Sequence, residues 1–258
     1  MMNRNGALIV LSIGTAVGLL FGLYPQLDLK ISALFFDPAR YKLWMGVSYP
    51  FWLARTGASW LTALVAAPAF VSLALKLLFP QRPALLPGRA GLVMIVTLAL
   101  GPGLVVNDIF KDHWGRPRPI DVTVFTGPDP FLPWWDPRGP CPKNCSFVAG
   151  EPSGAFWTVA PAVLVPAPWR ILATSAAVVF GMAVGLLRVA AGGHFFSDVA
   201  FSGVFTFVII WLVHGLIYRW RQTRITDAAV ERWLDKVTTP IQRAGTWIAG
   251  RRTRPDPT

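Results

Sequence analysis

The stretch KDHWGRPRP collects four basic side chains within one short polar segment: Lys111, His113, Arg116 and Arg118. A guanidinium group binds a phosphate through two parallel hydrogen bonds, and an ammonium group binds it as a point charge. The prolines on either side of Arg118 restrict the backbone and so limit where that side chain can reach. The segment therefore predicts a phosphate site, with contact to lipid headgroups without catalysis as the alternative.

A second polar segment, RVAAGGHFFSD, contains Arg188, His194 and Asp198. The spacing of His194 and Asp198 would stack their side chains on one face of a helix. A carboxylate bonded to one ring nitrogen of a histidine fixes its tautomer and leaves the other nitrogen free to act as a nucleophile. We expect Asp198 to hold His194 in this way, with Arg188 reaching the same anion and the Gly-Gly pair allowing a close backbone approach.

Together the two segments resemble the motifs of the type 2 phosphatidic acid phosphatase family of membrane lipid phosphatases. The first fits the family pattern of Lys, six residues, Arg-Pro, and the second fits its last motif of Arg, five residues, His, three residues, Asp. Leu187 is a departure, because the family usually has serine before the arginine. The residues that match are Lys111, Arg118, Arg188, His194 and Asp198.

The resemblance implies that the protein hydrolyses a lipid phosphate through a phosphohistidine intermediate. It makes His194 the nucleophile and Asp198 its orienting partner, while Lys111, Arg118 and Arg188 hold the phosphoryl oxygens. It implies no metal ion and no other cofactor.

The family's middle motif, Pro-Ser-Gly-His, is altered in this chain and can be aligned in two registers. Matching Pro-Ser-Gly at 152–154 puts Ala155 at the histidine, and alanine cannot transfer a proton. Matching the Ser-Phe pair at 146–147, which usually precedes the motif, puts Glu151 there instead. We prefer the second register because it keeps both flanks of the motif and supplies a titratable group.

We therefore predict that Glu151 is the general acid/base, which protonates the leaving oxygen or activates water. A phosphate dianion and apolar lipid beside it would raise its pKa, whereas neighbouring cations would lower it. The alternative is an acid placed at a helix N-terminus, where the helix dipole favours it. Further possible substrate contacts are His113, Arg116, Ser146 and Ser153.

The composition of the 258-residue chain is that of a multi-span membrane protein, because 53% of it is hydrophobic and only 14% is charged. The net charge is +11, and the basic residues lie between the apolar stretches. They form no basic repeat interleaved with aromatic residues. We therefore expect a lipid bilayer as its partner and no nucleic acid.

Six apolar stretches reach or approach the ~20 residues that a helix needs to cross a bilayer. We predict an all-α, polytopic membrane protein with a bundle of six transmembrane helices. The first stretch could be mistaken for a signal peptide, but no convincing cleavage site follows it, so we treat it as a retained span. The predicted spans are 7–24, 60–79, 90–110, 153–165, 169–187 and 199–220.

Positive charge in the short connections predicts the orientation of these spans, because cytoplasmic loops carry an excess of Lys and Arg. A phosphatase domain over residues 1–220 would have extracytoplasmic active-site loops at about 111–152 and 188–198. A basic cytoplasmic tail, residues 221–258, would follow. Its Trp233 and Trp247 fit either a helix lying on anionic lipid or a solvated tail.

The two cysteines of the chain, Cys141 and Cys145, lie in one of these loops. Two thiols are too few for a structural zinc site, so we expect a small disulfide in an oxidising compartment, with free thiols as the alternative.

We expect an integral lipid phosphatase of the bacterial inner membrane whose active site faces the periplasm. Its middle motif and its cysteine-containing loop resemble the lipid A phosphatase branch of the family. Undecaprenyl diphosphate and phosphatidylglycerophosphate are alternative substrates, and a catalytically silent lipid-phosphate binder is the alternative function.

Overall fold

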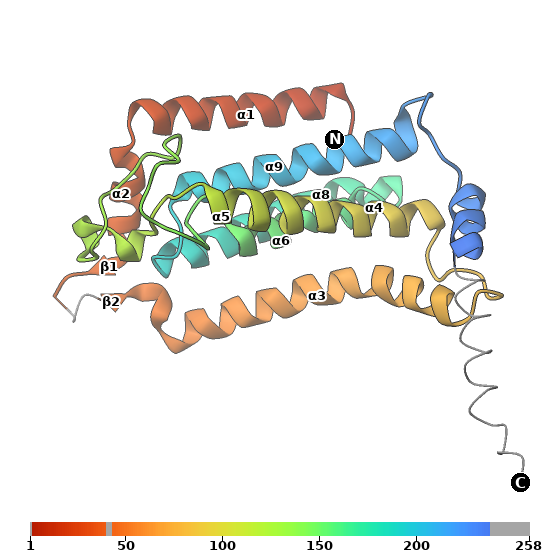
Figure 1. Cartoon of the computed structure of the whole chain (residues 1–258), viewed down its shortest axis with the longest axis horizontal. Helices are drawn as coiled ribbons and strands as arrows, with labels where there is room; N and C mark the ends of the chain where they lie inside the picture. The colour runs from red at the N-terminus through yellow and green to blue at the C-terminus, as the bar shows by residue number, and fades with distance from the viewer. Residues whose placement is uncertain (1, 40–42, 238–258) are drawn as a thin grey trace, which may run out of the picture.

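The computed structural model describes residues 2–39 and 43–237. Long helices run roughly side by side through it, and the connecting segments gather at the two ends of the bundle (Figure 1). One helix is continuous through three segments, because α4 is followed directly by the π-helical η2 and by α5. The long helices are α1 (Arg4–Leu23), α3 (Tyr49–Leu78), α4 (Gly88–Leu98) with η2 (Ala99–Phe110) and α5 (Lys111–His113), α8 (Ala167–Ala190) and α9 (Phe196–His214).

Five helices of the described residues are long and apolar enough to cross a membrane. The predicted all-α membrane bundle is therefore confirmed, and of the predicted spans only 153–165 is not among these five helices. That segment forms two short helices, α6 (Gly150–Trp157) and α7 (Val159–Ala162). At 8 and 4 residues, neither approaches the ~20 residues that a bilayer requires.

Helix α6 lies inside the bundle, where it packs against α8 and α9. Two glycines of α8 make this packing possible. A Cβ at Gly181 would collide with the Phe156 ring of α6, and a Cβ at Gly185 would collide with Val199 of α9. Small residues allow helix backbones to approach closely, which is the usual means of packing helices within a membrane.

The helix that leads to the first basic motif is wound as a π-helix over its last half, η2. Pro102 lies within this segment. Since proline has no N–H and its ring crowds the preceding turn, it disfavours ordinary α-helical bonding there. The π-helical winding ends at Phe110, and Lys111 follows immediately.

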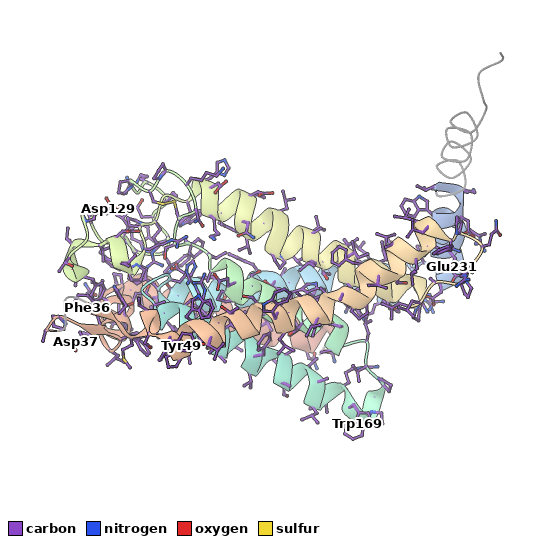
Figure 2. All side chains as sticks on the ribbon, turned by 90° about the horizontal axis from the view of Figure 1, so that it is seen from below. Phe36, Asp37, Tyr49, Asp129, Trp169 and Glu231 are labelled. Carbon is purple, nitrogen blue, oxygen red and sulfur yellow. A yellow bond between two sulfur atoms is a disulfide. The ribbon has the colours of Figure 1, made fainter. Side chains whose placement is uncertain are left out.

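Most of the irregular structure lies at the end of the bundle where α1 ends and α3 begins (Figure 1). Figure 2 places Phe36, Tyr49 and Asp129 at this end and Trp169 and Glu231 at the other. We call the first the loop end. It contains α2 (Gln26–Ala33), the paired strands β1 (Phe36–Asp37) and β2 (Leu43–Trp44), and the 3-10 turn η1 (Met45–Val47). It also contains the long segment 114–149, which includes the 3-10 turns η3 (Pro119–Asp121) and η4 (Thr123–Phe125).

At the opposite end, α9 continues into the π-helical η5 (Gly215–Arg219) and the chain then turns back onto the bundle. Residues 227–237 are helical. Asp227 of this helix pairs with Arg89 at 2.8 Å, and Asp235 pairs with Lys76 at 2.8 Å. The start of the basic tail therefore packs against the ends of α3 and α4, whereas Trp247 lies outside the described residues.

Candidate active site

The two polar motifs of the sequence meet at the loop end. Lys111 lies in the last turn of the membrane helix that contains η2, and Arg118 follows that helix, whereas Arg188 belongs to the last turn of α8. His194 lies in the turn between α8 and α9, and Glu151 lies in the first turn of α6. Four separate elements thus contribute to one group of side chains.

His194 is the candidate nucleophile, and only 2% of its surface is exposed. Its Nδ1 lies 2.7 Å from the carbonyl oxygen of Ser146. Since a carbonyl oxygen can only accept, Nδ1 carries the proton and Nε2 keeps its lone pair. Burial lowers the pKa of His194 well below its ordinary value, and the charges of Arg188, Arg118 and Lys111 lower it further. The ring is therefore neutral and its Nε2 is nucleophilic at neutral pH.

The direct bond that we expected between Asp198 and His194 is not formed, because the nearest carboxylate oxygen is 4.0 Å from Nδ1. Asp198 instead accepts hydrogen bonds from the Ser146 hydroxyl at 2.5 Å and from the backbone N–H of Phe195 at 2.8 Å. Ser146 thus connects the two residues, since its carbonyl holds the ring and its hydroxyl holds the carboxylate.

Arg116 holds the other oxygen of Asp198, and its guanidinium is completely buried. It also donates to Asp28 of α2 at 2.8 Å, and Asp28 accepts from the backbone N–H and the hydroxyl of Ser197. The sequence interpretation missed Asp28, whose only signal was a lone acid within the apolar segment LDLKISALFF. We call Asp28, Arg116 and Asp198 the buried triad.

These contacts correct three of the possible substrate contacts. Arg116 and Ser146 are fully buried within hydrogen-bonded networks, and Ser153 is buried against Thr206 of α9, 2.7 Å away. Each side chain has protein partners for its polar atoms, so none of the three faces a substrate. His113 is exposed, and its ring turns back to the carbonyl groups of its own helix.

Three cations remain beside His194 as candidate phosphate ligands. Lys111, Arg118 and Arg188 each act electrostatically on the imidazole ring. Arg188 is 7% exposed, and its Nε is a buried donor that has no hydrogen-bond partner within the described part of the chain. A buried donor on a charged group that makes no hydrogen bond is costly, and an anion placed there would satisfy it.

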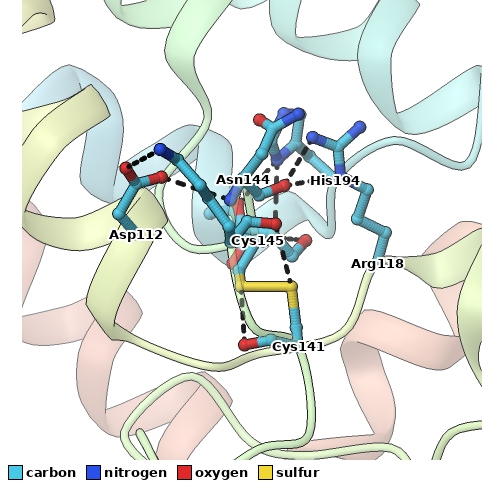
Figure 3. The surroundings of a disulfide bond; sticks show 9 residues. Asp112, Arg118, Cys141, Asn144, Cys145 and His194 are labelled. Carbon is cyan, nitrogen blue, oxygen red and sulfur yellow. Dashed lines mark hydrogen bonds and ion pairs between the residues drawn. A yellow bond between two sulfur atoms is a disulfide. The ribbon is translucent and has the colours of Figure 1, made fainter.

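The disulfide between Cys141 and Cys145 closes a short turn next to these groups (Figure 3). The carbonyl of Asn144, inside the turn, accepts from Arg118 at 2.7 and 3.2 Å. The carbonyl that holds His194 belongs to the residue directly after Cys145. One cross-linked turn therefore positions the side chains of both Arg118 and His194.

Glu151 lies in the same group of cations, with its Oε1 3.8 Å from Nε of Arg188. Arg55 of α3 donates to it from Nε at 2.7 Å and from Nη2 at 2.5 Å. Burial acts to raise the pKa of Glu151, but the Arg55 hydrogen bonds and the charges of Arg188, Arg55 and Lys111 outweigh it, so the pKa lies below its ordinary value. The expected lowering by neighbouring cations therefore outweighs the effect of burial.

The location of Glu151 favours the second register of the middle motif. Its side chain is 34% exposed and adjoins Arg188, whereas Ala155 is 1% exposed within the bundle. Arg55 was missed by the sequence interpretation because we expected the second span to begin at Trp60, whereas α3 begins at Tyr49.

Comparisons with known proteins show the family of this chain. The family model described as PAP2 superfamily matches residues 90–225, just over half of the 258-residue chain. The chain belongs to the PAP2 superfamily. The resemblance predicted from the motifs is thereby confirmed, and with it the prediction of a membrane-embedded phosphoric ester hydrolase. The matched residues of this PAP2 chain contain His194 and the three cations, while Asp28 and Arg55 lie outside them.

Three curated PAP2 relatives are each named lipid A 4'-phosphatase. The protein of Francisella tularensis subsp. novicida (strain U112) is 37% identical over 204 residues, which cover 77% of this chain and 90% of that protein. The protein of Rhizobium leguminosarum is 35% identical over 117 residues, 45% of this chain and 50% of its own. That of Rhizobium etli is 35% identical over 112 residues, 43% of this chain and 44% of its own. No solved structure matches the chain.

Proposed function

We propose that the protein removes the 4'-phosphate of lipid A by way of a phosphohistidine, at a site that faces the periplasm from the bacterial inner membrane. One observation carries the proposal: a buried, neutral His194 whose Nδ1 is held by a carbonyl and whose neighbours are three cations. The names of the three relatives support lipid A as the substrate.

In the first step, the Nε2 lone pair of His194 attacks phosphorus and the bond from phosphorus to the lipid oxygen breaks. Lys111, Arg118 and Arg188 neutralise the three equatorial oxygens, which is the main form of catalysis in phosphoryl transfer. The leaving oxygen takes a proton from the Glu151 carboxyl. The negative charge of the bound phosphoryl group raises the pKa of that carboxyl and so favours its protonation.

In the second step, a water molecule attacks phosphorus and the bond to Nε2 breaks, which returns His194 to its neutral form. The water proton passes to the Glu151 carboxylate, and inorganic phosphate leaves. The Arg55 pair keeps Glu151 ionised and aimed at the site when it must act as this base.

The proposed orientation follows from charge. The loop end contains the disulfide, which suits an oxidising compartment, and the opposite end continues into the basic tail. The domain limits that we proposed, 1–220 for the membrane phosphatase and 221–258 for the cytoplasmic tail, follow the same reasoning.

The test is phosphate release by the purified protein in detergent from lipid A, undecaprenyl diphosphate and phosphatidylglycerophosphate. We expect release from lipid A, its loss in His194→Ala, and a kcat roughly 10²–10⁴-fold lower in Glu151→Gln, the range for a general acid/base. His214→Ala is the matched control, because it removes a histidine at the far end of α9 from the site and should leave the rate unchanged.

Alkaline quenching of the reaction preserves a phosphohistidine, so mass spectrometry should find phosphate on the peptide that contains His194. If the protein released phosphate faster from undecaprenyl diphosphate or phosphatidylglycerophosphate than from lipid A, that lipid would be the substrate instead of lipid A. If the protein bound these lipids but released phosphate from none of the three, it would be a catalytically silent lipid-phosphate binder and not an enzyme. Full activity of Glu151→Gln would overturn the role of Glu151.

A further inference from the structure

A cavity of about 530 Å³ opens beside Glu151. Apart from Glu151, every residue that lines it belongs to the first turns of α3. They recur at three- and four-residue spacing, which defines a single face of that helix. The lining residues are Trp52, Arg55, Thr56, Ser59, Trp60 and Glu151.

The side chains of this cavity have the chemistry of a sugar-binding surface. Trp52 is 52% exposed and Trp60 is 68% exposed, so their indole rings are available to a ligand. A sugar ring presents apolar C–H faces, which pack on aromatic rings, and hydroxyl groups, which bind to polar and charged side chains. The hydroxyl of Ser59 donates to the Arg55 carbonyl at 3.1 Å, so its oxygen remains an acceptor.

The geometry of phosphoryl transfer directs the leaving group to this cavity. The attacking atom, Nε2 of His194, and the leaving lipid oxygen would lie on opposite sides of phosphorus. Arg188 and Lys111 act electrostatically on both His194 and Glu151, and Arg188 reaches within 3.8 Å of Glu151. The proposed phosphate-binding cations therefore lie between His194 and Glu151. A leaving group opposite His194 would lie on the side of Glu151, where the cavity opens.

We propose that this cavity is the subsite for the sugar ring whose phosphate is removed, with Trp52 and Trp60 as the side chains that determine specificity for a phosphorylated sugar. The inference rests on the proposed function. Lipid A carries its 4'-phosphate on a glucosamine ring, whereas the scissile phosphates of phosphatidylglycerophosphate and undecaprenyl diphosphate are not attached to a sugar.

Tryptophans also form belts at membrane interfaces, and the test separates that role from sugar binding. We would measure kcat/KM for lipid A in Trp52→Ala, Trp60→Ala and the control Trp135→Ala. Trp135 is 51% exposed, lies against the loop end of α1 and does not line the cavity. We expect a roughly tenfold loss in the first two variants, the scale of one aromatic contact, and less than twofold in the control. Trp52→Phe, which keeps an aromatic face, should retain most of the activity.

Inhibition by inorganic phosphate completes the test, because the ion occupies the phosphate site alone. We expect its inhibition constant to be the same in all of these variants. Equal losses in Trp52→Ala, Trp60→Ala and Trp135→Ala would overturn the subsite, and so would a weakening of phosphate inhibition that parallels the loss for lipid A. Failure of the native protein to act on lipid A is a separate result, which would overturn the proposed function and the subsite together.

Discussion

Replacing Arg116 with methionine tests whether the buried triad holds the loop end together. The side chains of Arg116 and Asp198 are 0% exposed and that of Asp28 is 1% exposed, so the variant leaves two desolvated carboxylates without their cation. Removing one partner of a buried ion pair typically costs about 3–5 kcal/mol. For a chain of this size each kcal/mol lowers the melting temperature by roughly 2–4 °C, so we expect a decrease of about 6–20 °C.

Arg138→Met is the matched control, because it removes the same charge from the same loop. Arg138 pairs with Asp136 at 2.9 Å, but its side chain is 81% exposed. An exposed pair contributes about 0–1 kcal/mol, so the control should melt within a few degrees of the native protein. Both variants would be followed by circular dichroism during heating in one detergent.

The refuting results are equally specific. If Arg116→Met had the same melting temperature as Arg138→Met, the buried triad would not stabilise the loop end. Adding Asp28→Asn to Arg116→Met removes one of the two uncompensated carboxylates and should restore part of the lost stability. The opposite result is a double variant that is less stable than Arg116→Met by the amount that Asp28→Asn alone destabilises the native protein. That additive result would show that Asp28 and Arg116 act independently.

Three further predictions concern the site itself. Gly193→Ala should lower kcat/KM roughly ten- to hundredfold with little change in melting temperature, because its Cβ would overlap the Arg188 guanidinium and displace it from phosphate. Because the pKa of His194 is lowered by burial and by nearby cations, the unfolded state binds the proton first, and the unfolding free energy should decrease as pH falls below about 6.5. This decrease, measured by denaturant titration across pH, should be smaller in His194→Ala than in the native protein. Replacing both Cys141 and Cys145 with serine should cost about 2 kcal/mol for so short a loop and raise KM, measured by phosphate release, because the turn that holds Arg118 loosens.

The sequence was sufficient to predict the parts of the site that depend on local spacing. Lys111, Arg118, Arg188 and His194 were recognised because motifs record which residue types follow one another along the chain. The long apolar stretches likewise predicted the membrane helices, because twenty apolar residues have few other stable locations.

The sequence interpretation was less successful where a contact joins distant segments. The spacing of His194 and Asp198 suggested a direct bond, but the loop before α6 inserts the Ser146 carbonyl at Nδ1. That contact depends on a turn 48 residues away, which spacing within one motif cannot reveal. Asp28 and Ser197 are 169 residues apart, and only the packing of α2 against α9 brings them together.

Helix limits were the other weakness, because hydropathy locates the apolar centre of a helix better than its polar end. The face of α3 that begins at Trp52 was placed in a connecting loop, so Arg55 was not recognised as the partner of Glu151. The apolar segment after Glu151 was predicted as one continuous span, but hydropathy does not reveal that Thr158 divides it into α6 and α7.

Asp198 and Glu151, the two acidic side chains near His194, have opposite environments. This difference suits them to different roles in the proposed mechanism. Asp198 is wholly enclosed, and each of its oxygens is held by protein donors, so it is suited to fixing geometry and has no access to a leaving group. Glu151 is one-third exposed and its cationic partner, Arg55, is 41% exposed, so that pair can open with far less desolvation cost than the triad. A proton donor must be free to change its charge in each catalytic cycle, whereas an orienting group must not. In the register that we prefer, the residue at the family's histidine position, Glu151, is therefore the one whose surroundings suit proton transfer.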